Sequence, residues 1–130
     1  MNKGSYREMF SHIGIDVSKE KLDVGWLRDT ASNKVKTKVF KNQKQSFEVL
    51  AAWVLKNTKA EPQHILITLE ATGVYHENLA YCLHQQGFKV MVANPGKAKQ
   101  YARAIGLVHK TYKLDALMLA HYGMAQSNAG

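Results

Sequence analysis

His-Ile-Gly-Ile-Asp-Val occupies residues 12–17, and a second apolar run, His-Ile-Leu-Ile-Thr-Leu, occupies residues 64–69. Each run has the length of a β-strand. The first is followed by a polar turn at 18–21 and a β-prone run at 22–27, which together predict a hairpin. The second does not alternate between apolar and polar residues, as is typical of a strand covered on both faces. These runs predict the centre of a mixed sheet.

A third strand is expected next to the hairpin, at residues 33–40. Its residues alternate, with Val35, Thr37 and Val39 on one face and Lys34, Lys36 and Lys38 on the other. This period of two is typical of a half-exposed strand. The lysines have two interpretations, protection of a sheet edge against aggregation and contact with phosphates.

The rest of the chain alternates between helical and extended patterns. We expect helices at 43–57, 75–86, 97–105 and from Thr111 to about Ala125, and a fifth strand at 88–93. Ser46 or Asn42 is expected to cap the first helix, Gly87 to end the second and Thr111 to cap the last. Three meandering strands followed by two strands with crossover helices is the order of a ribonuclease-H-like fold. We therefore expect an α/β protein with a five-stranded mixed sheet flanked by helices, in which the first strand is central.

Composition excludes several classes of protein. The 130 residues are 45% hydrophobic and 22% charged, which is ordinary globular composition. The apolar runs are too short to cross a membrane, and the first residues contain no secretory signal. Cys82 is the only cysteine, so a disulfide framework and a multi-cysteine zinc site are excluded, and a reducing cytoplasm is expected.

The charge points to a polyanionic partner. Eighteen Lys and Arg against ten Asp and Glu give a net charge of +8. Nucleic acid is the first candidate and an anionic membrane surface the second. The predicted helix at 97–105 carries Lys97, Lys99 and Arg103 around Tyr101, whose ring would either stack on a base or pack the helix onto the sheet.

Three acidic residues lie where chemistry is expected. Asp16 is near the end of the first strand, Glu70 follows the run 65–69, and Asp115 is in the first turn of the last helix. Ligands gather at strand ends in open α/β sheets, and carboxylates are the ligands that Mg²⁺ and Mn²⁺ prefer. Each acid also has a structural alternative: Asp16 would cap the turn at Ser18, Glu70 the helix that follows it, and Asp115 would favour a helix dipole.

The sequence around these acids resembles a known family. Ile13-Gly-Ile-Asp-Val-Ser-Lys19 and Leu69-Glu-Ala-Thr-Gly-Val-Tyr-His76 resemble the first two motifs of the DEDD transposases of the insertion-sequence-110 group, a family that also resembles pilin-gene invertases. Asn94-Pro95, Tyr101-Ala-Arg-Ala104 and Lys110-Thr-x-x-x-Asp-Ala116 resemble the later motifs, in the same order. The resemblance covers nearly the whole chain.

This resemblance implies an N-terminal domain like that of the RuvC resolvase, in which acidic residues bind divalent metal. We expect residues 1–130 to form that single domain, without the C-terminal domain of the family. By the same resemblance, Asp16, Glu70 and Asp115 are the expected catalytic and metal-binding residues, with Mg²⁺ or Mn²⁺ as the cofactor. Nucleic-acid contacts are expected at Lys34, Lys36, Lys38, Lys97, Lys99, Arg103 and Lys110.

One residue departs from the family pattern. The last motif of the family has two Asp residues on one helix face, and the first of them is Tyr112 here. A neutral phenol with a pKa of about 10 is a poor Mg²⁺ ligand. We therefore expect the N-terminal catalytic domain of a DNA transposase or recombinase, inactive in strand cleavage on its own.

Two other functions stay open at this point. One is a non-catalytic module that binds DNA or guide RNA. The other is an actin-like or sugar-kinase nucleotide-binding domain, although Ser18-Lys19-Glu20 lacks the Gly-Thr/Ser turn that such a domain needs. The expected partners are DNA and, by resemblance, guide RNA; a homo-oligomer is left open, no membrane is expected, and the expected location is the bacterial cytoplasm.

Overall fold

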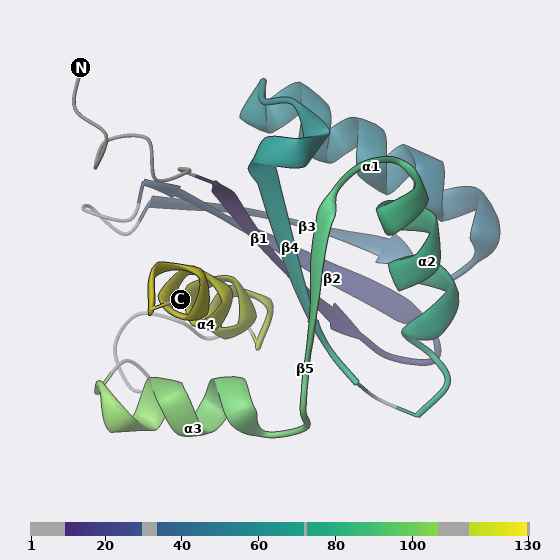
Figure 1. The fold of residues 1–130 in the computed structure, drawn as a ribbon. Helices are drawn as coiled ribbons and strands as arrows, with labels where there is room; N and C mark the ends of the chain where they lie inside the picture. The colour runs from purple at the N-terminus through teal and green to yellow at the C-terminus, as the bar shows by residue number, and fades with distance from the viewer. Residues whose placement is uncertain (1–9, 30–33, 72, 107–114, 130) are drawn as a thin grey trace, which may run out of the picture.

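A computed structural model describes residues 10–29, 34–71, 73–106 and 115–129 of the chain. Its centre is one five-stranded sheet (Figure 1). The strands are β1 (Ser11–Val17), β2 (Lys21–Asp29), β3 (Lys34–Lys41), β4 (Ile65–Glu70) and β5 (Lys89–Ala93). Their order across the sheet is β3-β2-β1-β4-β5, so the first strand is central, as predicted.

The sheet is mixed. β2 pairs antiparallel with both β1 and β3, whereas β4 pairs parallel with β1 and with β5. A polar turn joins β1 to β2, and the Ser18 hydroxyl closes it by donating to the Lys21 carbonyl at 3.0 Å. This order of strands confirms the predicted ribonuclease-H-like α/β fold.

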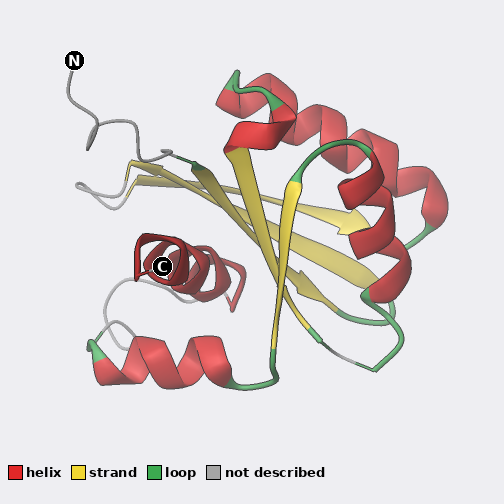
Figure 2. Ribbon diagram, viewed as in Figure 1, coloured by secondary structure: helices red, strands yellow, loops and turns green. Residues whose placement is uncertain are grey.

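Helices cover both faces of the sheet (Figure 2). On one face lie α1 (Lys44–Thr58) and α2 (Glu77–Gln85); on the other lie α3 (Lys97–Ala104) and α4 (Asp115–Ala129). A single 3-10 turn, η2 (Pro62–His64), leads into β4. No helix of the described residues is long and apolar enough to cross a membrane.

The alternation of side chains along the strands builds the main core on the α1 and α2 face. Branched residues at every second position of β1, β2 and β4 pack there against both helices. The largest of them are fully buried: Ile13, Ile15, Leu22, Val24, Ile65, Ile67 and Leu69 from the strands, with Leu50, Leu79 and Leu83 from the helices. The remaining strand positions point to the face under α4.

The α4 face has a different construction, because small residues let the helix backbone lie directly on the sheet. A Cβ added to Gly14 in β1 would overlap the Ala116 carbonyl oxygen and lie 2.6 Å from the Ala120 backbone nitrogen. A Cβ on Gly123 would collide with the Thr68 hydroxyl of β4. Glycine at these positions therefore sets how closely α4 approaches the central strands.

Two local predictions are wrong. The residue before α1 is Gln43, and no side chain caps the helix, so neither Ser46 nor Asn42 does so. The Asn42 amide instead donates to the Ser18 carbonyl at 2.6 Å and ties the end of β3 to the β1–β2 turn. In β3 residues 34–39 are exposed on both faces rather than on one, and β3 is an edge strand of the sheet.

The end of α2 follows the prediction. Gly87 has φ +98° and its amide donates to the His84 carbonyl, while the Phe88 amide donates to Leu83. This is the closing pattern of a helix that ends in a left-handed glycine. The expected cap of the last helix, Thr111, is outside the described residues.

Candidate functional site

Asp16 and Glu70 come to one end of the sheet and to one face of it. Ile15 and Val17 point into the α1 and α2 core, so Asp16 between them points to the α4 face. Leu69 belongs to the same core, so Glu70 also points to the α4 face. β1 and β4 are parallel neighbours, and both carboxylates are near the C-terminal ends of their strands. The sequence-based prediction placed them side by side for this reason.

The Asp16 carboxyl group is half-buried and its pKa is raised to about 6, with burial as the largest cause. Three further carboxylates add to this rise by repulsion, in decreasing order Asp115, Asp23 and Glu70. Lys21 acts in the opposite direction with a smaller effect. Asp115 and Glu70 are therefore near enough to Asp16 to raise its pKa, so the three predicted acids lie in one region of the structure.

A fourth carboxylate, that of Asp23, was missed in the sequence. Asp16 pairs with Asp23 across the β1–β2 hairpin, and directly paired residues project from the same face of a sheet. The signal was available, because a hairpin that turns at residues 18–21 brings Asp23 opposite Asp16. Two like charges that face each other are destabilising unless a cation or a proton separates them.

Glu70 is held by the start of a helix. Its Oε2 accepts a hydrogen bond from the Gly96 amide at 2.7 Å, immediately before α3. A carboxylate at a helix N-terminus is stabilised by the unpaired amides and the helix dipole. The alternative that Glu70 caps the helix following it is wrong, because that helix is α2, whose N-cap position is His76.

Asp115 is the first residue of α4, and its side chain is exposed. It lines a cavity of about 90 Å³ together with Glu70, Gly96 and Lys99. Because Gly14 sets the position of α4 on the sheet, it also sets the position of Asp115 relative to the strand-end acids. Carboxylates from β4 and α4 thus border one small hollow together with Lys99, and Asp16 of β1 is not part of its lining.

The donor chemistry of this cluster fits a hard divalent cation. Mg²⁺ and Mn²⁺ prefer carboxylate oxygens, and several carboxylates near one another favour a cation between them. Across the part of the chain that the structure describes, no three His, Cys, Asp or Glu side chains converge as a ready-made set of metal ligands. Tyr112, which stands where the last motif described above has an Asp, is outside the described residues.

The predicted basic residues divide between the two faces. Lys34, Lys36 and Lys38 point to the α1 face, where the Lys36 ammonium group donates to the Asn57 side-chain oxygen at 2.6 Å. They are therefore across the sheet from the acids. Lys38 has its ammonium group 5.8 Å from the centre of the Phe40 ring.

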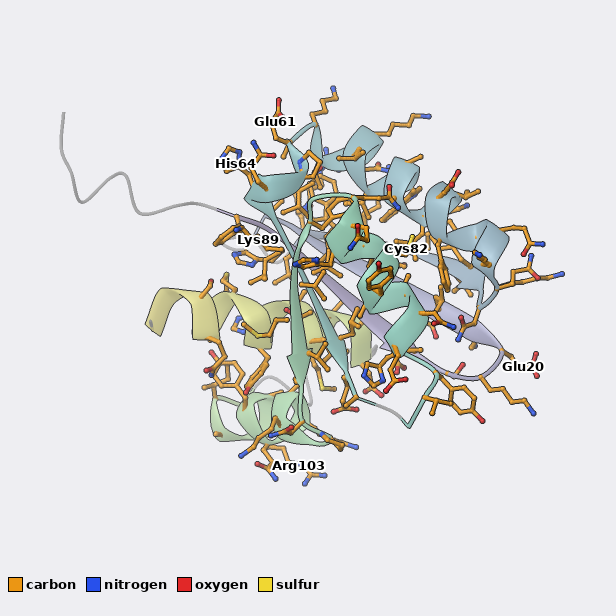
Figure 3. The ribbon with its side chains drawn as sticks, turned by 45° about the vertical axis from the view of Figure 1, so that its right-hand side comes forward. Glu20, Glu61, His64, Cys82, Lys89 and Arg103 are labelled. Carbon is orange, nitrogen blue, oxygen red and sulfur yellow. The ribbon has the colours of Figure 1, made fainter. Side chains whose placement is uncertain are left out.

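Helix α3 carries the other basic group, on the face of the acids. Lys97 and Arg103 are exposed, and Arg103 projects outward from α3 (Figure 3). Tyr101 packs its ring against His121 and Tyr122 of α4, with centroid distances of 5.6 and 5.9 Å. The tyrosine therefore joins the two helices. Lys110 is outside the described residues.

Comparison with known proteins places this geometry in context. The family model of the DEDD transposases of the IS110 type matches residues 13–129. A pilin gene-inverting protein of Moraxella bovis is 34% identical over 118 residues, which are 90% of this chain and 35% of the relative. The protein of the same name from Moraxella lacunata is 33% identical with the same coverage. The chain thus spans about a third of the length of these relatives.

A solved structure shares the fold at low sequence identity. It is a Bacteroides thetaiotaomicron protein with an actin-like ATPase fold, 13% identical, with a TM-score of 0.51 over 78% of this chain and 41% of that one. Actin-like domains share the strand order of the ribonuclease-H-like fold, so this likeness concerns the fold alone. The family match over residues 13–129 favours a transposase over an actin-like nucleotide-binding domain.

Proposed function

The chain belongs to the IS110-type DEDD transposase family, and from this membership we propose that it is the N-terminal catalytic domain for metal-dependent cleavage and exchange of DNA strands. The observation that supports the proposal is the gathering of carboxylates around Asp16: burial first, and their repulsion second, raise the pKa of Asp16 to about 6. A bound cation would relieve this repulsion. Asp16, Glu70 and Asp115 are the proposed metal-binding and catalytic residues.

In this proposal each acid has a separate task. Asp16 binds the cation only when it is ionised, so a proton and the metal compete for its carboxylate. Glu70 has one oxygen oriented by the Gly96 amide, which leaves its other oxygen available to a ligand. Asp115 contributes its carboxylate from α4, so its distance from the other two depends on the seating of that helix.

The metal would supply the chemistry that these side chains lack. When bound, two divalent ions would stabilise the attacking and leaving oxygens at a scissile phosphate. Lys99 borders the same cavity as Glu70 and Asp115, and its positive charge attracts a DNA phosphate toward the acids. Lys97 and Arg103 extend this attraction along α3.

Calorimetric titration with Mn²⁺ tests the proposal on this chain. We expect Mn²⁺ binding that Asp16→Asn and Glu70→Gln each weaken at least tenfold, and that Glu20→Gln leaves unchanged. Glu20 is the matched control, because its exposed carboxylate lies in the β1–β2 turn (Figure 3) and is not among the groups that raise the pKa of Asp16. Equal Mn²⁺ binding by all three variants would overturn the assignment of the acids.

A non-catalytic nucleic-acid-binding module is the second candidate. Tyr112 favours it, because one acid of the family motif is replaced by a phenol. The two candidates differ in one assay, Mn²⁺-dependent nicking of branched DNA. Restoring the acid by Tyr112→Asp should produce nicking only if the chain retains the catalytic site.

A further inference from the structure

A groove of about 1130 Å³ runs between α1 and α2, on the face of the sheet opposite α4. One end of it opens beside Lys19 in the β1–β2 turn and Tyr75 in the segment before α2. Lys19 follows Asp16 by three residues, and Tyr75 follows Glu70 by five. The groove therefore opens at the same end of the sheet as the acids, around the edge from them.

The groove has an aromatic and amide-rich lining. Tyr81 is 68% exposed and Tyr75 45% exposed, and Val74 beside them is 69% exposed. Exposed side chains of this size have a free surface on which a flat ring can stack. The amide residues that border the groove are Asn42, Gln43, Asn78, Gln85 and Gln86. Amides both donate and accept hydrogen bonds, as nucleobase edges do.

The charge of the lining favours an anionic occupant. Lys19 and Lys44 are the two lysines that border the groove, and Glu48 is its one carboxylate. Both helices begin at this end, α1 at Lys44 and α2 at Glu77, with no side-chain cap on the first amides. The partial positive charge of the two helix N-termini therefore adds to the positive charge of Lys19 and Lys44.

We propose that this groove binds an unpaired strand of DNA that continues from the acidic site. The inference rests on the proposed function, which places DNA at Asp16 and Glu70. In it Tyr75 and Tyr81 stack on bases, the amides contact base edges without strong sequence preference, and Lys19 and Lys44 neutralise phosphates. The groove exceeds the roughly 300–1,000 Å³ of a small-molecule pocket, so it has room for more than one nucleotide. A duplex does not offer its base faces for stacking, so the groove selects single strands.

Cys82 provides a direct test, since it lines the groove on α2 and is the only cysteine (Figure 3). We expect (dT)12 at saturation to slow alkylation of Cys82 by N-ethylmaleimide at least fivefold, and a 12-base-pair duplex to leave the rate unchanged. No slowing by (dT)12 overturns the proposal. Stronger protection by (rU)12 than by (dT)12 overturns the assignment to DNA, and protection that rises with protein concentration alone would assign the groove to a second copy.

Substitutions test the contribution of each group. Tyr81→Leu should weaken (dT)12 binding about fivefold or more, because stacking on a base is lost, and Tyr81→Phe should restore it. Lys19→Gln with Lys44→Gln should reduce the salt dependence of binding by somewhat more than one unit of slope. Lys56→Gln, at the other end of α1 and outside the groove, is the control and should change neither quantity. Unchanged affinity in Tyr81→Leu contradicts the stacking role.

The groove and the acidic site can fail separately. If Asp16→Asn abolishes Mn²⁺ binding while (dT)12 leaves Cys82 unprotected, the groove proposal is wrong and the proposed function stands. If (dT)12 protects Cys82 while Asp16→Asn and Glu70→Gln bind Mn²⁺ as tightly as the unsubstituted chain, the groove binds DNA and the acids are not the metal site.

Discussion

Asp16 and Asp23 stand opposite each other in the antiparallel β1–β2 pair and project to the face of the sheet that α4 covers. Repulsion from Asp23 is one of the causes that raise the pKa of Asp16 to about 6. Two facing carboxylates on adjacent strands cost stability in the absence of a cation. The sheet therefore carries a local electrostatic strain at the proposed metal site, and that strain has measurable consequences.

Asp16→Asn should stabilise the folded chain at neutral pH without metal. The pKa of Asp16 is about 6 in the folded chain against 3.8 ordinarily, so the folded state binds the proton more tightly. The cost of the ionised carboxylate is thus complete above pH 6 and disappears below about pH 4. After allowance for the partial exposure of the group, we expect a gain of about 1–2 kcal/mol at pH 7.5 and none at pH 3.5.

Urea unfolding in EDTA at the two pH values measures this gain. Asp23→Asn should produce a smaller gain, since it removes only one source of repulsion and leaves Asp16 buried. Glu20→Gln is the control and should change stability little. A lower stability of Asp16→Asn at pH 7.5 would contradict the repulsion.

The buried His12 should make the fold sensitive to acid. Its side chain is 8% exposed between β1 and α4, and burial, with a further contribution from His121, lowers its pKa to about 4. In the unfolded chain the His12 side chain takes up a proton below about pH 6.5, but in the folded chain it does so only below about pH 4. Stability from this group is therefore lost as the pH falls from 6.5 to 4, by on the order of 3 kcal/mol.

His12→Gln should remove this loss, so that the variant loses less stability than the unsubstituted chain between pH 6.5 and 4. Chemical unfolding at several pH values gives the comparison. His84→Gln, an exposed histidine on α2, should leave the pH dependence unchanged. Identical pH profiles for His12→Gln and the unsubstituted chain would show that His12 titrates normally.

Gly14→Ala should displace α4 and with it Asp115. The added methyl group would meet the backbone of Ala116 and Ala120, which cannot rotate away. We expect a loss of about 3 kcal/mol and a fall in the pKa of Asp16 as Asp115 moves off. Gly25→Ala is the matched comparison, because its methyl group would meet the flexible Leu117 side chain at 2.8 Å and should cost about 1 kcal/mol.

Thermal unfolding and a carbon-detected NMR titration of Asp16 measure the two effects. Equal losses in the two glycine variants would show that the α4 backbone yields as easily as a leucine side chain. If Gly14→Ala is destabilised but the pKa of Asp16 is unchanged, the position of α4 on the sheet does not control the electrostatics of the acidic site.

Tyr112→Asp should raise the affinity for Mn²⁺. A restored Asp at position 112 is three residues before Asp115 and adds a charged oxygen ligand that a phenol does not supply. We expect at least a tenfold gain with an unchanged circular dichroism spectrum. Tyr112→Phe is the control, because it removes the hydroxyl without adding a charge. Equal affinity of the Asp and Phe variants would mean that position 112 is not a metal position in this chain.

The basic residues of α3 should matter more for DNA binding than those of β3. Replacing Lys97, Lys99 and Arg103 by Gln removes charges on the face of the acids, and the slope of log K against log salt should fall by up to about 2.7 units. Replacing Lys34, Lys36 and Lys38 should change it less, since these residues project to the opposite face. Fluorescence anisotropy with a duplex at four salt concentrations measures the slope for each variant. A larger fall in slope in the β3 variant than in the α3 variant would assign the β3 lysines to phosphate contact.

The periodicity of the sequence was enough to predict the strands and the α-helices of the described part within a few residues, but not the 3-10 turn η2. β1 and β4 are apolar runs too short for other elements, and Gly87 needed a left-handed conformation that few other residues adopt. Local hydrogen bonding was not predictable in the same way. Asn42 has the chemistry of a helix cap, but in the structure its side-chain amide donates a hydrogen bond to the Ser18 carbonyl in the β1–β2 turn, 24 residues away in the chain.

What the sequence determined by itself is the order of the elements and the positions of Asp16, Glu70 and Asp115 at their ends, because hydrophobic period and turn residues are local properties. Only the tertiary structure decided which groups share a face. It put Asp23 beside Asp16 through strand register, joined Glu70 to Gly96 across 26 residues, and separated the β3 lysines from the acids by the thickness of the sheet. The reason is physical: charges interact through space, and distance in space is set by pairing and packing between segments far apart in the chain.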